Sequence, residues 1–141
     1  MVSFFEKLKA RVDAGDTLLC VGLDPHVAQL PDATADAALA FCLKIIAETH
    51  EYAAAFKPNA AFFEALGSGG VDVLQQVISA VPDHIPVILD VKRGDISTTA
   101  AAYASSAFDV LGAGSVTLAP YMGWDSVAPF VTGDYTDKGA F

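Results

Sequence analysis

Apolar positions along the chain follow two alternating spacings. Phe4, Phe5, Leu8 and Val12 recur at the spacing of one helix face, and Ser3 stands where an N-cap is expected. Continuous apolar runs of strand length follow at residues 17–23, 53–59, 86–92 and 115–121. Segments with helical spacing lie between and after them, at residues 34–51, 60–66, 71–81, 96–111 and 125–131.

This alternation predicts an α/β fold. Strands that alternate with helices favour a parallel sheet, and continuously apolar strands are typical of a sheet covered on both faces. The pattern is compatible with an open doubly wound sheet and with one half of a βα barrel, and periodicity alone does not choose between them. The end of the chain, residues 133–141, closes on apolar residues that are compatible with the start of a further strand.

Composition excludes several classes of protein. The 141 residues are 53% hydrophobic, and the mean hydropathy is +0.43. Even so, no window reaches the roughly 20 uninterrupted apolar residues of a membrane span, and a chain this apolar is not expected to be disordered. The first residues do not resemble a signal peptide. The length suits one domain but not a complete eightfold βα barrel of roughly 250 residues.

The net charge of the chain limits the kinds of binding partner that are expected. Eight Lys and Arg against 17 Asp and Glu give a net charge of −9, so nucleic acid is not expected as a partner. A small anionic substrate stays compatible with a few cations focused at one site. Cys20 and Cys42 both fall in apolar stretches, which predicts reduced core thiols in a cytoplasmic protein.

Ionisable residues end three of the predicted strands. Asp24 follows the first, Lys57 lies at the end of the second, and Asp90 and Lys92 lie at the end of the third. The carboxyl ends of parallel strands carry the chemistry of α/β folds. Charge clusters there favour a functional site, although a structural salt-bridge network is the competing interpretation.

The segment from Asp90 to Asp95 is the most informative. Alternation along a strand places Asp90 and Lys92 on the same face. Asp95 either caps the helix at 96–111 or extends a charge ladder that includes Lys57. In such a ladder the neighbouring carboxylates keep each lysine protonated, so an ammonium proton donor stands ready. A metal site is less expected, because Lys92 already supplies the countercharge.

Other candidates are weaker. Ser68-Gly69-Gly70 is either a phosphate contact or, as we prefer, a plain break between two helices. Tyr121 and Trp124 are expected to be packing residues.

The chain resembles the orotidine 5′-phosphate decarboxylases, in their longer bacterial form that is also fused in some uridine monophosphate synthases. The resemblance rests on four segments in the family's order, which are Gly22-Leu23-Asp24-Pro25, Phe56-Lys57-Pro58-Asn59, LDVKRGDISTTAAAYA from Leu89 and APYMGWDSV from Ala119. The third segment contains the family's Asp-x-Lys-x-x-Asp pattern.

The resemblance implies a cytoplasmic, homodimeric βα-barrel lyase of pyrimidine biosynthesis that needs neither metal nor organic cofactor. Residues 1–141 would then be the amino-terminal half of one barrel domain, with about the first four βα units. The family's phosphate-binding arginine belongs to the other half, and neither Arg11 nor Arg93 matches it. Whether the chain is a fragment or is completed by another polypeptide stays open.

Roles follow from the resemblance by position. Asp24 would bind the ribose, and Lys57 would join the charge network and reach the ribose. Asp90 would face the carboxylate of the substrate. Lys92 would protonate the pyrimidine carbon after direct loss of CO2, which leaves a carbanion that fixed charges must stabilise.

Two further residues are expected to act across the dimer. Asp95 and Thr99 would be contributed to the site of the neighbouring subunit. Two alternatives remain: a magnesium-dependent sugar-phosphate decarboxylase or synthase of the same barrel superfamily, and a non-catalytic half-barrel that serves dimerisation.

Overall fold

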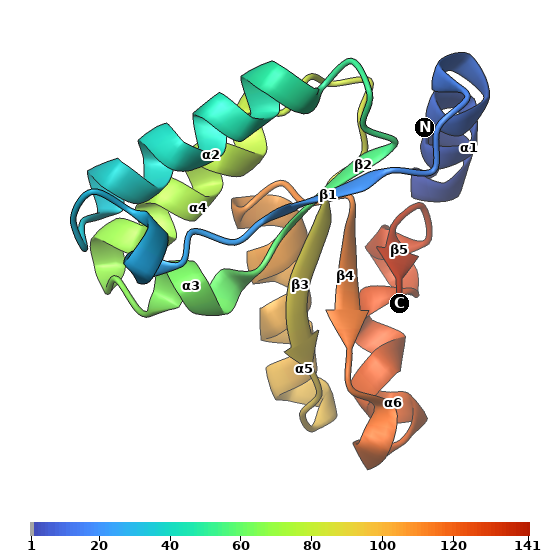
Figure 1. The fold of residues 1–141 in the computed structure, drawn as a ribbon. Helices are drawn as coiled ribbons and strands as arrows, with labels where there is room; N and C mark the ends of the chain where they lie inside the picture. The colour runs from blue at the N-terminus through green and yellow to red at the C-terminus, as the bar shows by residue number, and fades with distance from the viewer. Residues whose placement is uncertain (1) are drawn as a thin grey trace.

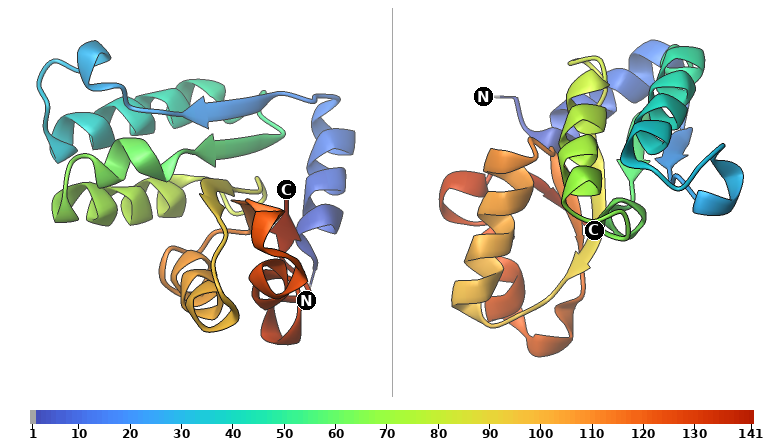
Figure 2. Two further views of the ribbon diagram at one scale, coloured as in Figure 1. Left: turned by 90° about the horizontal axis from the view of Figure 1, so that it is seen from below. Right: turned by 90° about the vertical axis from the view of Figure 1, so that its left-hand side faces the viewer.

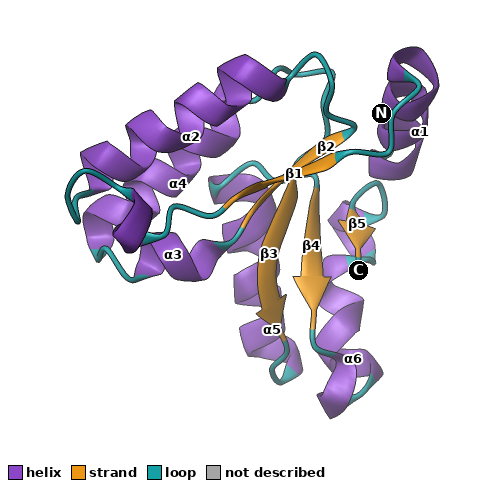
Figure 3. Ribbon diagram, in the orientation of Figure 1, coloured by secondary structure: helices purple, strands orange, loops and turns teal. Residues whose placement is uncertain are grey.

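A computed structural model describes residues 2–141 as an α/β chain in which helices and parallel strands alternate (Figures 1 and 3). The helices are α1 (Phe4–Gly15), α2 (Ala35–Thr49), α3 (Ala60–Glu64), α4 (Ser68–Ala80), α5 (Ser97–Ser105) and α6 (Trp124–Val127). The strands are β1 (Cys20–Leu23), β2 (Ala55–Pro58), β3 (Ile88–Arg93), β4 (Ser115–Leu118) and β5 (Gly139–Ala140). Within residues 2–141, no helix combines the length and the apolar character that crossing a membrane requires.

The strands lie side by side in chain order and all pair in parallel. β1 pairs with β2, and β3 pairs with β4, which pairs with β5. Isolated bridges from Phe56 to Val87 and from Asn59 to Asp90 join the two groups. This sequential order resolves the choice that periodicity left open, because a doubly wound sheet reverses its strand order and this one does not. The arrangement is a partial barrel.

One face of the strands packs against the helices. Leu23, Phe56, Leu89 and Val116, one from each of β1 to β4, belong to a single buried cluster with residues of α2, α4 and α5. Strand side chains alternate between faces, so each of these residues points outward to the helices while its neighbours point inward. The main hydrophobic core therefore lies between the strands and the outer helices.

The opposite, inner face holds a smaller cluster at its base. Phe4 of α1 packs with Ala55 and Ile88, two inward-facing strand residues. Figure 2 shows α1 standing across the ends where β1 and β2 begin. Since α1 covers the amino-terminal ends of the strands, the carboxyl ends are the open side of the inner face.

Local signals explain where several elements begin and end. Ser3 and Glu6 form a capping box at the start of α1, and Asp16 ends that helix with a φ of 44°. The predicted strand at 115–121 ends at Leu118, because Pro120 has no N–H to donate and opens a 3₁₀ turn. The predicted helix at 96–111 divides into α5 and a π-helical turn, Ser106–Val110.

The predicted break between two helices exists, but it does not extend through Ser68-Gly69-Gly70. The chain turns only at Gly67, whose φ is 74°, and α4 begins at Ser68. Gly70 lies where α3 meets α4, and a Cβ at this position would stand 2.0 Å from the carbonyl oxygen of Phe63. This glycine therefore serves a close approach between two helices and not a break.

Two predictions of burial also need correction. Cys42 is buried, but Cys20 is exposed, because it lies in the inward-facing register of β1, a strand at the edge of the sheet. Tyr121 and Trp124, expected to pack, are 96% and 66% exposed. They follow β4 on short turns that reach beyond the core of this chain.

Candidate active site

A β-bulge in β3 shapes the candidate site. Ile88 and Leu89 pair with Ser115 and Val116, but the next paired residue of β3 is Arg93, opposite Leu118. Three residues of β3, 90–92, thus lie opposite the single Thr117 of β4. The two additional residues bend the strand without exchanging its faces, because side chains alternate with a period of two.

The bulge brings Asp90 and Lys92 together on the inner face, as alternation predicts. The Lys92 ammonium Nζ lies 2.5 Å from Asp90 Oδ1. To reach this position, Lys92 adopts a φ of 45°, a left-handed conformation that is uncommon for a residue other than glycine. Strain of this kind is most often found at functional sites.

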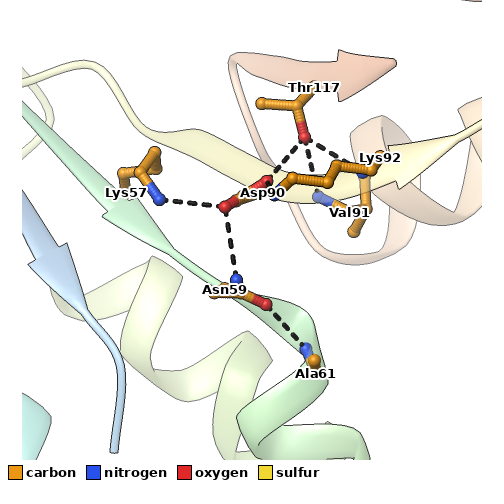
Figure 4. A network of polar contacts seen from close by, with 7 residues as sticks. All are labelled: Lys57, Asn59, Ala61, Asp90, Val91, Lys92 and Thr117. Carbon is orange, nitrogen blue, oxygen red and sulfur yellow. Dashed lines mark hydrogen bonds and ion pairs between the residues drawn. The ribbon is translucent and has the colours of Figure 1, made fainter. Parts of the chain in front are cut away.

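Four side chains donate hydrogen bonds to the Asp90 carboxylate (Figure 4). Oδ1 accepts from Lys92 and, at 2.8 Å, from the Thr117 hydroxyl. Oδ2 accepts from Lys57 at 2.9 Å and from the Asn59 amide at 3.3 Å. These donors come from β2, β3, β4 and the β2–α3 junction, so the sheet topology assembles them.

Electrostatics keep this cluster ionised. Burial opposes the charge of Asp90, which is 5% exposed, but hydrogen bonds from Lys92, Lys57 and Thr117 outweigh burial and lower the pKa to about 2. Burial likewise opposes the charge of Lys57, yet the hydrogen bond and the charge of Asp90 prevail and raise its pKa. The carboxylate and the Lys57 ammonium are therefore both charged at neutral pH.

The two lysines differ in access. The side chain of Lys57 is 33% exposed, whereas that of Lys92 is 67% exposed beyond the buried carboxylate. Asp90 thus forms the floor of the cluster, and the Lys92 ammonium stands on its open side. A bound molecule with a negatively charged reacting centre would meet Lys92 as a proton donor.

Asp24 is brought to the same edge. It follows β1, and its negative charge contributes to the raised pKa of Lys57. Its Oδ1 atom is buried and has no hydrogen-bond partner among residues 2–141. A buried carboxylate oxygen without a donor is uncommon, and this atom has unused capacity to accept a hydrogen bond.

Asp95 and Thr99 do not join the cluster within this chain. Ile96, not Asp95, is the N-cap of α5, so the capping interpretation of Asp95 is wrong. The Asp95 carboxylate instead accepts a hydrogen bond from the Ile96 N–H at 2.7 Å, in the loop between β3 and α5. Thr99 lies half-buried in the first turn of α5.

Both arginines have other structural partners. Arg11 donates to the backbone carbonyls of Ala53, His50 and Glu51. Arg93 points to the outer face, where it pairs with Glu64 at 2.8 Å and lies 4.6 Å from the centre of the Tyr103 ring. Neither guanidinium faces the Asp90 cluster.

Two members of the cluster were not identified from the sequence as site residues. Asn59 carries a double role, because its amide donates to Asp90 while its Oδ1 caps α3 by accepting from the Ala61 N–H. Thr117 is a polar residue inside an apolar run, and its inward register was the available signal. Among residues 2–141, no three His, Cys, Asp or Glu side chains gather as a metal site would require.

The chain matches the family model described as "Orotidine 5'-phosphate decarboxylase / HUMPS family" over residues 17–140. The orotidine 5′-phosphate decarboxylase of Herpetosiphon aurantiacus is 50% identical over 141 residues, which cover 98% of this chain and 52% of that protein. The chain spans about half the length of this and similar curated relatives.

Solved structures show the same likeness. OMP decarboxylase of Leishmania donovani superposes with a TM-score of 0.89 at 54% identity, over 99% of this chain and 52% of that one. UMP synthase of the same organism superposes with a TM-score of 0.91 at 53% identity, over 100% of this chain and 30% of that one.

Proposed function

The chain belongs to the orotidine 5′-phosphate decarboxylase / HUMPS family, and from this premise we propose that it forms one half of a lyase that converts orotidine 5′-phosphate to uridine 5′-phosphate. The observation that carries the proposal is the Asp90 carboxylate held between Lys57 and Lys92 at the carboxyl ends of the strands. This is where catalytic residues of βα barrels lie.

The chemistry is a direct decarboxylation. The bond between the pyrimidine carbon and its carboxylate breaks, CO2 leaves, and the bonding electron pair stays on the carbon as a carbanion. The Lys92 ammonium opposes this developing negative charge and then transfers one proton from Nζ to the carbon. Asp90 keeps the ammonium in place, and no metal or organic cofactor takes part.

Asp24 and Lys57 suit the sugar of the nucleotide. The buried Oδ1 of Asp24 lacks a donor among residues 2–141, and a ribose hydroxyl would supply one. Lys57 is one-third exposed beside it and already bound to Asp90, so it links the sugar site to the reacting centre.

Residues 1–141 are proposed to be the amino-terminal half of a single βα-barrel domain, with the first four βα units. The lengths of the relatives support this division, as does the inner face, which is open on the side of β1. The resemblance assigns the phosphate-binding arginine to the other half, and in this chain both arginines have other partners. The two free thiols suit a reducing cytoplasm.

We place Asp95 and Thr99 in the site of a second subunit. Neither contacts the Asp90 cluster of its own chain, although the loop that carries Asp95 follows β3 directly. Large exposed apolar side chains lie in this loop and after β4, at Ile96, Tyr121, Met122 and Trp124. A homodimer would cover this surface and bring Asp95 to its partner's nucleotide.

The test is release of CO2 from orotidine 5′-phosphate by the full-length protein that carries this chain, with excess chelator present. Lys92→Ala is the inactive variant, and Lys44→Ala is the matched control, since Lys44 pairs with Glu48 on the exposed side of α2. We expect release that resists the chelator and depends on Lys92. Release that survives the chelator would eliminate the magnesium-dependent sugar-phosphate branch, release abolished by the chelator would contradict the metal-free mechanism, and no release at all would contradict the proposed function.

A further inference from the structure

Thr117 of β4 lies opposite the bulge of β3 and forms hydrogen bonds with all three residues of the bulge. Its Oγ1 accepts hydrogen bonds from the backbone N–H groups of Val91 and Lys92, each at 3.0 Å, and donates to Asp90 Oδ1 at 2.8 Å. Figure 4 shows all three bonds converging on this single oxygen. One side chain of β4 therefore contacts three consecutive residues of β3.

The hydroxyl replaces a missing part of the sheet ladder. Between Leu89–Val116 and Arg93–Leu118 the two strands have no paired residues, so the N–H groups of the bulge need another acceptor. A hydroxyl oxygen has two lone pairs and one hydrogen. Since Val91 and Lys92 occupy both lone pairs, the hydrogen is left for Asp90, and the orientation of the hydroxyl is determined.

The same bonds reach both members of the ion pair. Thr117 holds Asp90 through its carboxylate and Lys92 through its backbone, at the residue whose φ is 45°. The Lys92 side chain starts from that constrained backbone and returns to Asp90. We propose that Thr117 is a positioning residue for the decarboxylation, which sets the placement of the proton donor Lys92 relative to Asp90. The catalytic part of this inference rests on the proposed function.

Electrostatics agree with this role. The hydrogen bond from Thr117 is one of those that lower the pKa of Asp90. Its loss would raise that pKa and weaken the hold on Lys92 at the same time. Threonine suits the position because the hydroxyl is needed for three bonds and the β-branched side chain is restricted in rotation.

The experiment compares Thr117→Val with Thr117→Ser in the full-length protein. Valine keeps the shape and removes all three hydrogen bonds, whereas serine keeps the hydroxyl. Thr17→Val is the matched control, because the Thr17 hydroxyl also donates to one group, the Tyr52 carbonyl, and accepts from another, the Leu19 N–H, but does so before β1.

We expect Thr117→Val to lower kcat on the order of 10²-fold, the scale of a small misplacement of a catalytic group, while KM changes little. The acidic limb of the pH profile should move to higher pH, and amide hydrogen exchange at Val91 and Lys92 should accelerate. Thr117→Ser should restore most of kcat and the exchange protection, and Thr17→Val should alter neither.

Unchanged exchange at Val91 and Lys92 in Thr117→Val, or a serine variant as impaired as the valine variant, would overturn the inference. Exchange at these two amides does not depend on the reaction. A wild-type protein without decarboxylase activity would therefore contradict the proposed function, while the exchange data still decide whether Thr117 holds the bulge. If Thr117→Val does not fold, the serine variant decides the question. It must keep the Val91 and Lys92 amides protected from hydrogen exchange, and loss of that protection would overturn the inference.

Discussion

Lys57 Nζ and Asp90 Oδ2 lie 2.9 Å apart, although 33 residues separate them in the chain. The parallel bridge between Asn59 and Asp90 places the end of β2 beside the end of β3 and so makes this contact. Asp90 therefore belongs to two ion pairs, one with the partly exposed Lys57 and one with the more exposed Lys92. Lys57 thus contacts the carboxylate from the less exposed side, and the Lys92 ammonium is the more accessible of the two.

Stability should depend on the ionisation of Asp90. Its folded-state pKa is lowered from 3.8 to about 2, so the folded state gains stability from the charged form above pH 3.8 and loses it as pH falls towards 2. The shift corresponds to about 2 kcal/mol. Chemical denaturation across this range should show the stability difference between the wild type and Asp90→Asn shrinking by about that amount. Asp72→Asn, at an exposed position of α4, is the control for the loss of one carboxylate elsewhere on the surface.

Lys92→Ala should lose nearly all turnover while nucleotide binding persists. General acid catalysis contributes roughly 10²–10⁴-fold to rate, and in the proposed mechanism Lys92 also opposes the carbanion charge. Single-turnover CO2 release measures the loss of turnover, and calorimetric titration of uridine 5′-phosphate measures whether nucleotide binding persists. Substantial remaining turnover would remove Lys92 from the role of proton donor.

Two inactive variants should complement each other if Asp95 acts across a dimer. Asp95→Ala and Lys92→Ala are each expected to be inactive alone. In a mixed dimer, one of the two sites combines an intact Lys92 with an intact Asp95 from the other subunit, and activity should return at that site. Failure to recover activity, with subunit exchange shown by differently tagged chains, would place Asp95 in the site of its own subunit.

Adjacent glycines of α4 should respond oppositely to alanine. A Cβ at Gly70 would lie 2.0 Å from the Phe63 carbonyl oxygen, while a Cβ at Gly69 would lie 3.6 Å from the Ala35 Cβ, an ordinary contact. Gly70→Ala should destabilise the protein by about 1–3 kcal/mol or more. Gly69→Ala should be stabilising by up to about 1 kcal/mol, because alanine restricts the unfolded chain and favours the helix. Thermal denaturation of both variants decides this, and equal effects would contradict the close approach of α3 and α4.

The sequence predicts the part of the site that depends on alternation along one strand and on parallel strands ending at the same edge. Asp90 and Lys92 meet as strand alternation requires, and Asp24 and Lys57 reach the same edge because parallel strands end together. The exposure of Tyr121 and Trp124 could not be predicted in this way. An aromatic residue in a turn or helix gives the same sequence pattern whether its own chain or another chain covers it.

The sequence by itself determined the alternation of helices and strands, the N-cap of α1 and the ionisable ends of the strands, because these depend on neighbours a few residues apart. Only the tertiary structure decided that the strands lie in chain order as a partial barrel and that Gly70 sits inside a helix. It also decided that Thr117 and Asn59 complete the Asp90 cluster. The bulge opposite Thr117 depends on the register of β3 against β4, whose contacting residues Val91 and Thr117 are 26 residues apart in the chain. The spacing of residues along one strand does not predict such a register.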